Sequence, residues 1–178
     1  MVGTVSAGIW RSTNEGATWS NVSDETLIRF VNDVKVAPSD PSLVYAATDM
    51  GLARSMDSGR TFEMSSWDGT QEYPTGRPVH YVAVDPNDPY TIVIASDGAL
   101  HRSTNAGATW TQIQGTDGEY WDLEWHPTNS RFVYALRRSP GWITFVRSNT
   151  GGESVNLGGN GLPEPVAGGS LVRARSAT

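Results

Sequence analysis

The chain has 178 residues, of which 38% are hydrophobic, 10% aromatic and 18% charged, with 19 Gly and 10 Pro. This composition excludes a disordered chain and favours many short strands and turns over helices. The formal net charge of -6 disfavours binding to nucleic acid, and the absence of cysteine excludes disulfides and thiolate metal sites.

Neither a metal site nor a membrane segment is expected from the sequence. His80, His101 and His126 are scattered without the spacing of metal ligands, so we expect no metal and no cofactor. No segment approaches the about 20 apolar residues of a membrane span, and no signal peptide is visible at the start of the chain. These patterns predict no membrane insertion and leave the compartment open.

A short turn sequence occurs four times along the chain. The copies are RSTNEGATW at 11–19, RSMDSGRTF at 54–62, RSTNAGATW at 102–110 and a divergent RSNTGGESV at 147–155. Their serines, Ser12, Ser55, Ser103 and Ser148, are separated by 43, 48 and 45 residues. A period of this length suits one four-stranded blade of a β-propeller.

The strands expected between these turns complete the blades in chain order. Residues 1–22 hold only the last three strands of a blade, and residues 170–178 could supply its missing first strand. Complete blades are expected at residues 30–65, 79–114 and 120–158, because each holds an apolar strand, a Pro-containing turn and further apolar strands. We therefore predict an all-β fold, a single β-propeller domain of about four four-stranded blades over residues 1–178.

The ends of the chain leave three arrangements open. Pairing of residues 170–177 with residues 3–7 would close a ring of four blades. Alternatively, the chain is a segment of a larger propeller, or several chains assemble into one ring. An incomplete ring has exposed sheet edges, which favour self-association.

A long insert at residues 65–78 joins two blades on the face that propellers commonly use for ligands. It contains Trp67, Asp68, Glu72 and Tyr73, an aromatic and acidic mixture that suits sugar binding. An ordinary loop that packs one tryptophan is the alternative.

The repeated turn has a structural explanation for each of its residue types. The Asn or Asp accepts backbone hydrogen bonds, the Gly permits a positive φ, the Thr begins the outer strand and the aromatic residue fills the space between blades. Preceding arginines are expected to make a repeated contact, either with an aromatic ring or with a carbonyl. The turn residues are Ser12, Asn14, Gly16, Thr18, Trp19, Ser55, Asp57, Gly59, Thr61, Phe62, Ser103, Asn105, Gly107, Thr109 and Trp110.

Residues 117–127 combine aromatic, acidic and histidine side chains, which is a composition typical of a functional site. Trp121, Leu123 and Trp125 nevertheless alternate as in an inner strand, so we expect them in the blade core and not on a sugar-binding platform.

The turn copies resemble the Asp-box, or BNR repeat, of sialidases, sortilin-type receptors, a photosystem II assembly factor and xyloglucan-hydrolysing glycoside hydrolases. Residues 31–110 are most similar to the xyloglucanase-like group. The resemblance implies a carbohydrate-related role, either glycan binding or hydrolysis of a β-glucan-type polysaccharide, in an extracellular or periplasmic protein. The alternative that it implies is a non-catalytic scaffold of the sortilin or photosystem type, whose loops bind a protein partner. The Arg-Ile-Pro signature of sialidases is absent from the sequence.

The same resemblance implies a catalytic role for Asp49, which lies in the sequence ATDMG. Glycoside hydrolysis needs a second carboxyl group about 5 to 10 Å away, and a structural turn residue is the alternative for Asp49. The carboxylates that could join it are Asp33, Asp68, Glu72, Asp117, Glu119, Asp122 and Glu124.

Overall fold

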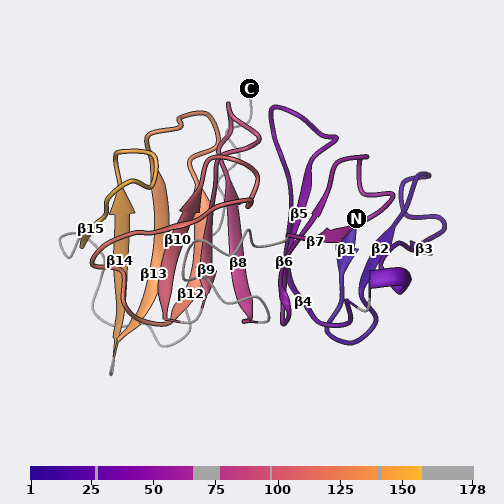
Figure 1. Cartoon of the computed structure of the whole chain (residues 1–178), viewed down its shortest axis with the longest axis horizontal. Coiled ribbons are helices and arrows are strands. Elements are labelled where there is room, and N and C mark those ends of the chain that lie inside the picture. Colours follow the sequence, from indigo (N-terminus) through magenta and orange to yellow (C-terminus); the bar gives the residue numbers. More distant parts are fainter. Residues whose placement is uncertain (27, 66–76, 97, 140–141, 158–178) are drawn as a thin grey trace.

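The computed structural model describes residues 1–26, 28–65, 77–96, 98–139 and 142–157. These residues form four antiparallel sheets, one of three strands and three of four strands (Figure 1). Each sheet consists of consecutive strands, and we number the sheets blade 1 to blade 4 in chain order. The insert residues Trp67, Asp68, Glu72 and Tyr73 and the strand predicted at 170–178 lie outside the described residues, so both expectations remain predictions.

The strands have the following bounds. Blade 1 contains β1 (Val2–Gly3), β2 (Ile9–Arg11) and β3 (Ser20–Asn21), and the 3-10 helix η1 (Asp24–Thr26) follows it. Blade 2 contains β4 (Val31–Val36), β5 (Val44–Thr48), β6 (Gly51–Ser55) and β7 (Glu63–Met64). Blade 3 contains β8 (Val79–Val84), β9 (Ile92–Ser96), β10 (Ala99–Ser103) and β11 (Thr111–Gln112). Blade 4 contains β12 (Tyr120–Trp125), β13 (Val133–Ser139), β14 (Trp142–Ser148) and β15 (Asn156–Leu157).

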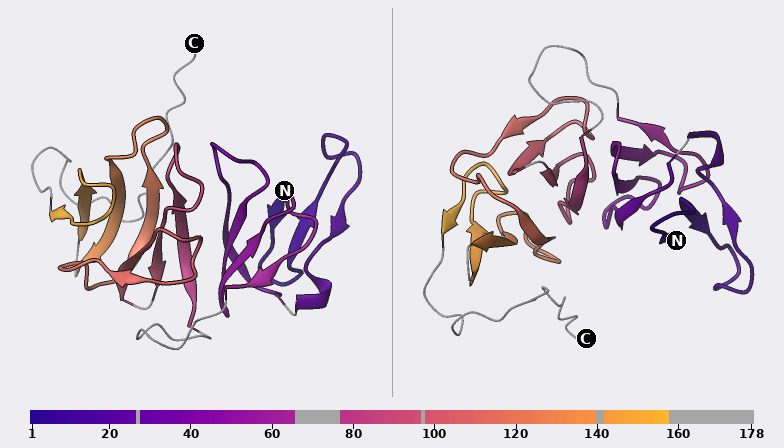
Figure 2. Two further views of the ribbon diagram at one scale, coloured as in Figure 1. Left: turned by 45° about the horizontal axis from the view of Figure 1, so that its top comes forward. Right: turned by 90° about the horizontal axis from the view of Figure 1, so that it is seen from below.

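The four blades follow one another along an arc, with blade 1 at one end and blade 4 at the other (Figure 2). Strand β8 packs against both β4 and β12, so the first strands of blades 2, 3 and 4 lie side by side on the inner side of the arc. This is the arrangement of neighbouring blades in a β-propeller. The predicted fold class is therefore confirmed.

The apolar core is divided into layers between the blades. One buried cluster contains Ile9 of blade 1 and Val44 of blade 2, a second contains Leu52 of blade 2 and Ile94 of blade 3, and a third contains Leu100 of blade 3 and Val133 of blade 4. Every residue of β5 and β9 is buried, because a second blade covers each face of these sheets. Removing this apolar surface from water favours the stacked arrangement.

All four turn copies are held by the same backbone hydrogen bonds. The serine hydroxyl accepts the N–H of the glycine four residues later, at 2.8 Å in Ser12 and Ser55 and at 2.9 Å in Ser103 and Ser148. An Asn or Asp oxygen accepts the N–H of the following threonine at 2.9 Å in the first three copies. Thr150 Oγ1 replaces that oxygen in the fourth copy and accepts the N–H of Ser154 at 3.0 Å.

The arginine before each of the first three turns donates to a carbonyl of the next blade. Arg11 reaches Ser58 O at 3.0 Å, Arg54 reaches Ala106 O at 3.1 Å and Arg102 reaches Gly151 O at 2.8 Å. Of the two contacts expected from the sequence, the carbonyl contact is the one that these arginines make.

The aromatic residue of the turn is buried in blades 2 and 3 but not in blade 1. Phe62 and Trp110 are 5% and 7% exposed, whereas Trp19 is 42% exposed. The expectation that this residue fills the space between blades is wrong for Trp19, because no blade covers that face of blade 1 in the described part of the chain.

Candidate functional site

A depression opens where the first residues of β8 and β12 meet the turn between β9 and β10. We call this end of the blades the rim. The depression has a volume of about 590 Å³. It is lined by His80, Ala95, Ser96, Gly98, Gly118, Glu119, Tyr120 and Trp121.

A β-bulge at the start of each inner strand directs residues toward the rim. The pairing register shifts between Val31 and Asp33, between Val79 and Tyr81, and between Tyr120 and Asp122. The extra residues are Asn32, His80 and Trp121. Bulges commonly re-aim side chains beside functional sites.

Trp121 departs from the strand alternation that the sequence predicts. Leu123 and Trp125 are buried in the core as expected, but Trp121 is half-buried and lines the depression. The expectation that Trp121 belongs to the blade core is wrong, because the bulge interrupts the two-residue period of the strand.

Glycine backbone forms part of the depression wall. Gly98 and Gly118 have positive φ values of 82° and 139°, and the N–H of Gly118 donates to Gly98 O at 2.6 Å. A side chain at Gly98 would meet no other atom within 4 Å, so this backbone is openly accessible. Next to it, Tyr120 donates its hydroxyl to Thr116 O at 2.7 Å, and burial raises the pKa of Tyr120 to about 12.

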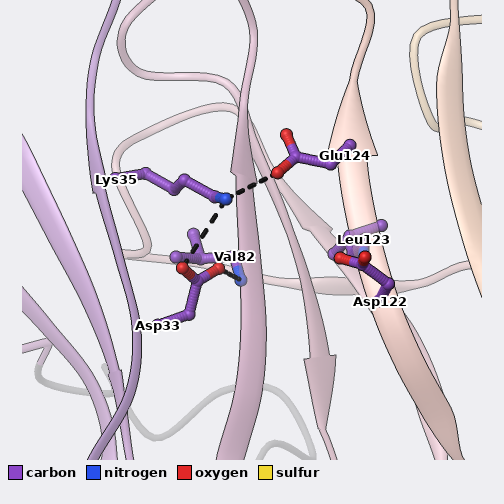
Figure 3. A network of polar contacts seen from close by, with 6 residues as sticks. All are labelled: Asp33, Lys35, Val82, Asp122, Leu123 and Glu124. Atoms are coloured by element: carbon purple, nitrogen blue, oxygen red, sulfur yellow. Dashed lines mark hydrogen bonds and ion pairs between the residues drawn. The ribbon is translucent and has the colours of Figure 1, made fainter. Parts of the chain in front are cut away.

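A polar network lies on the inner side of the arc, below the rim (Figure 3). Lys35 Nζ of β4 lies 2.7 Å from Glu124 Oε1 of β12 and 3.6 Å from Asp33 Oδ1. Asp33 Oδ2 also accepts the N–H of Val82 in β8 at 3.2 Å, so the network connects the first strands of three blades. Asp122 accepts the N–H of Leu123 at 2.9 Å on the same side.

Burial sets the ionisation of this network. Burial raises the pKa of the Asp33 carboxyl above its ordinary value, against the opposing effect of the Lys35 charge. Burial also raises the pKa of Tyr81, and the charges of Asp122 and Asp33 raise it further. The structure thus places Asp33 and Glu124, two of the predicted candidate carboxylates, around a single lysine, and a third, Asp122, on the same strand as Glu124.

Asp49 lies at the rim, in the turn between β5 and β6. Its backbone N–H donates to Phe30 O at 3.3 Å. Its Oδ1 atom is buried and has no hydrogen-bond partner among the described residues. The ion pairs of the network link Asp33 and Glu124 to Lys35 and do not include Asp49.

The remaining candidate carboxylates lie at the rim or outside the described residues. Glu119 forms an exposed ion pair with Arg138 at 2.8 Å, and Asp117 Oδ1 accepts from Gln112 Nε2 at 3.3 Å. Asp68 and Glu72 are not among the described residues. The residues described in the structure include no cluster of three or more His, Asp or Glu side chains placed to hold a metal ion, and none of their helices is long and apolar enough to cross a membrane.

No protein-family model matches the chain, and no curated protein matches its sequence. Solved structures do match. An ancestral GH74 enzyme is 18% identical with a TM-score of 0.68, over 86% of this chain and 21% of that chain. The GH74 xyloglucanase from Xanthomonas campestris is 19% identical with a TM-score of 0.66, over 88% of this chain and 27% of that chain.

A second kind of β-propeller also matches. The structure of YCF48 bound to D1 peptide is 13% identical with a TM-score of 0.53, over 71% of this chain and 38% of that chain. At these identities the likeness shows the fold alone. The chain is therefore similar to β-propellers of two different kinds, and it spans between 21% and 38% of the length of these three chains.

Proposed function

We propose that the chain binds a carbohydrate in the rim depression. The observation that carries the proposal is the half-buried Trp121 beside the open backbone of Gly98, with His80, Ser96 and Glu119 on the same lining. Aromatic faces pack against the C–H faces of sugar rings, and short polar groups take up the hydroxyls. The similarity in fold to GH74 enzymes supports this ligand class. We also propose that the four repeated turns are Asp-box repeats.

Binding has more support than hydrolysis. Hydrolysis needs one carboxyl held protonated and a second one ionised across the scissile bond. Asp49 carries a buried Oδ1 atom without a partner, but Asp33 and Glu124 are joined to each other through Lys35. The two carboxylates of the network thus contact Lys35 and not Asp49.

Calorimetric titration with xyloglucan oligosaccharides tests the proposal. We expect binding by the unchanged protein and an affinity about 5- to 30-fold weaker for Trp121→Ala, since an aromatic platform contributes on the order of 1–2 kcal/mol. Tyr90→Ala is the matched control, because Tyr90 is 45% exposed and lies outside the depression. Equal affinity of the two variants, or no binding of any glycan on an array, would contradict the proposal. Release of reducing sugar that Asp49→Ala abolishes would extend it to hydrolysis.

A non-catalytic protein-interaction scaffold is the second candidate. A hollow of about 410 Å³ along the inner strands favours it, with Lys35, Glu124, Pro38, Pro41 and Trp125 in its lining. Apolar and charged groups side by side suit a peptide, and the similar YCF48 structure holds one. Peptide binding that Trp121→Ala leaves unchanged, with no response to glycans, would favour this candidate.

A further inference from the structure

Each end of the arc presents a sheet face that no other blade covers in the described part of the chain. These two faces resemble the two faces that meet where neighbouring blades pack together. In the described part of the chain, no blade follows blade 4 and none precedes blade 1 (Figure 2). We call the exposed side of blade 4 the end face and the exposed side of blade 1 the start face. Equivalent positions in the internal blades are found by aligning the turn serines and the strand registers.

The end face carries a row of aromatic side chains. Phe132 and Tyr134 stack with ring centroids 6.5 Å apart, and Tyr134 and Phe145 stack at 5.9 Å. All three are half-buried. Their equivalents in blade 2, Leu43, Tyr45 and Leu52, are 2%, 0% and 4% exposed because blade 3 covers them.

The start face is apolar as well. Val2 and Trp19 are 44% and 42% exposed, and Trp10 is half-buried beside them. Their equivalents in blade 2 are Ala46, Phe62 and Ala53, which are 0%, 5% and 0% exposed. Exposed apolar patches of this kind mark interaction surfaces.

Neighbouring blades are also joined by a hydrogen bond from an arginine to a backbone carbonyl. Blade 4 presents such an arginine on the end face, and blade 1 presents such a carbonyl on the start face. The arginines of blades 1, 2 and 3 donate to a carbonyl in the turn of the following blade. The acceptor is always the residue three positions after the turn serine, namely Ser58, Ala106 or Gly151. Arg147 is the arginine at this position in blade 4; it is exposed, and its guanidinium lies 6.0 Å from the Phe132 ring centroid. It makes no such carbonyl contact among the described residues.

Glu15 is the corresponding third residue in blade 1. Its φ of 57° matches the 63° of Ser58 and the 56° of Ala106, so its backbone has the same conformation. Glu15 is also the only residue at this position that carries a charge, and the charge is opposite to that of Arg147. The two faces therefore match in apolar character and are opposite in charge at this position.

We infer that a second copy of this chain docks head to tail, with the end face of one protomer against the start face of the next. The Arg147 guanidinium of one copy would donate to Glu15 O of the other, and Trp19 would pack against Phe132, Tyr134 and Phe145. Within one protomer the two faces lie at opposite ends of the arc, so they do not meet (Figure 2). A head-to-tail contact leads to a ring or to a filament, and the arc makes each added copy curve toward a ring.

Sedimentation velocity and light scattering test the inference. We expect the unchanged protein to form a species of at least twice its 19.2 kDa mass, with a concentration-dependent equilibrium. Trp19→Ser is expected to weaken the association at least 10-fold, because exposed aromatic anchors dominate such contacts. Tyr90→Ser is the control of matched exposure and should associate like the unchanged protein. Circular dichroism checks that both variants fold.

Cross-linking tests whether the contact is head to tail. Only the introduced cysteines can react, because the chain has no cysteine of its own. Glu15→Cys and Arg147→Cys proteins are prepared separately, mixed, and treated with a short bifunctional maleimide. Head-to-tail docking predicts cross-linked dimer in the mixture and none in either variant alone. A monomer at all concentrations would overturn the inference. Cross-linking of Arg147→Cys with itself would overturn it in favour of a symmetric contact.

Discussion

At the scale of single residues, one side chain closes each repeated turn. Asp57 Oδ1 accepts the N–H groups of Arg60 and Thr61 at 2.8 and 2.9 Å, and Asp57 Oδ2 accepts the Thr61 hydroxyl at 2.8 Å. These hydrogen bonds, above all the one from the Thr61 N–H, lower the pKa of the Asp57 carboxyl well below its usual range. Asn14 and Asn105 accept the same threonine N–H with an amide oxygen, so the turn requires an acceptor and not a charge.

The role of Asp57 predicts different effects for two substitutions. Asp57→Asn keeps the acceptor and should change the free energy of unfolding at pH 7 by less than about 0.5 kcal/mol, whereas Asp57→Ala should lower it by about 1–2 kcal/mol. Urea unfolding measures both. Because its pKa is lowered on folding, the ionised carboxylate stabilises the fold at pH values above the pKa it has in the unfolded chain. This contribution is lost as the pH falls through the folded-state pKa. Asp57→Asn should therefore be less acid-sensitive than the unchanged protein. Equal stability of both variants would remove the role assigned to Asp57.

Turn residues could be predicted from the sequence because their contacts are local. The residue three positions after the turn serine is Glu15, Ser58, Ala106 or Gly151, and these residues share no chemical property. Their common positive φ therefore leaves no signal in the sequence. The hydroxyl of Thr150 could replace an amide oxygen because a single acceptor at this point suffices.

At the scale of strands, the alternation of apolar and polar residues predicted β12 but not the side chain that faces the depression. Leu123 and Trp125 follow the two-residue period, and the bulge at Trp121 breaks it. A bulge depends on the register with the neighbouring strand, so one strand read alone does not contain it. The alternation therefore predicts Trp121 in the core and gives no indication that Asn32 and His80 lie at the rim.

The third strand of blade 3 contains a titratable residue that should make stability depend on pH. Burial lowers the pKa of His101 in β10 to about 4. Because the unfolded chain binds the proton more tightly, unfolding takes up a proton between about pH 6.5 and pH 4, and the unfolding free energy should fall as the pH falls through this window. His101→Gln should remove this contribution, which is at most about 1.4 kcal/mol per pH unit.

Urea unfolding at a series of pH values between 7 and 4.5 measures this dependence of stability on pH. His80→Gln is the control, because His80 is exposed at the rim, and the slope should persist in this variant. The prediction fails if His101→Gln retains the full slope.

At the scale of the whole molecule, the repeat period predicted a propeller because one turn copy marks each blade. The contacts between residues of different blades could not be predicted from the sequence. Which carboxylates converge depends on how three inner strands stack, and the sequence alone did not rank Asp33, Asp122 and Glu124 above the other candidates. The exposure of Trp19 depends on whether a blade precedes it, since its turn is the same as that of the buried Trp110.

The Lys35 network connects three blades, so its loss should affect the inner side of the whole arc. The side chains of Asp33 and Glu124 are only 17% and 19% exposed, and Lys35 is the cation that joins them. Lys35→Met leaves two partly buried carboxylates close together, and we expect the unfolding free energy at pH 7 to fall by about 1–3 kcal/mol. Loss of the lysine charge removes the effect that opposes burial and so raises the pKa of the Asp33 carboxyl further in the folded state.

Because of this change in pKa, the stability lost in Lys35→Met should depend on pH, whereas a loss of packing alone would not. A folded-state pKa raised above the unfolded value stabilises the protonated fold, so the difference between the variant and the unchanged protein should shrink as the pH falls from 7 toward 4.5. Adding Glu124→Gln to Lys35→Met removes one carboxylate and should recover part of the lost stability at pH 7. Lys35→Arg should retain most of it, because the guanidinium keeps the charge. A stability loss that is the same at both pH values would show that the alkyl chain of Lys35, and not its charge, stabilises the contact between blades 2 and 4.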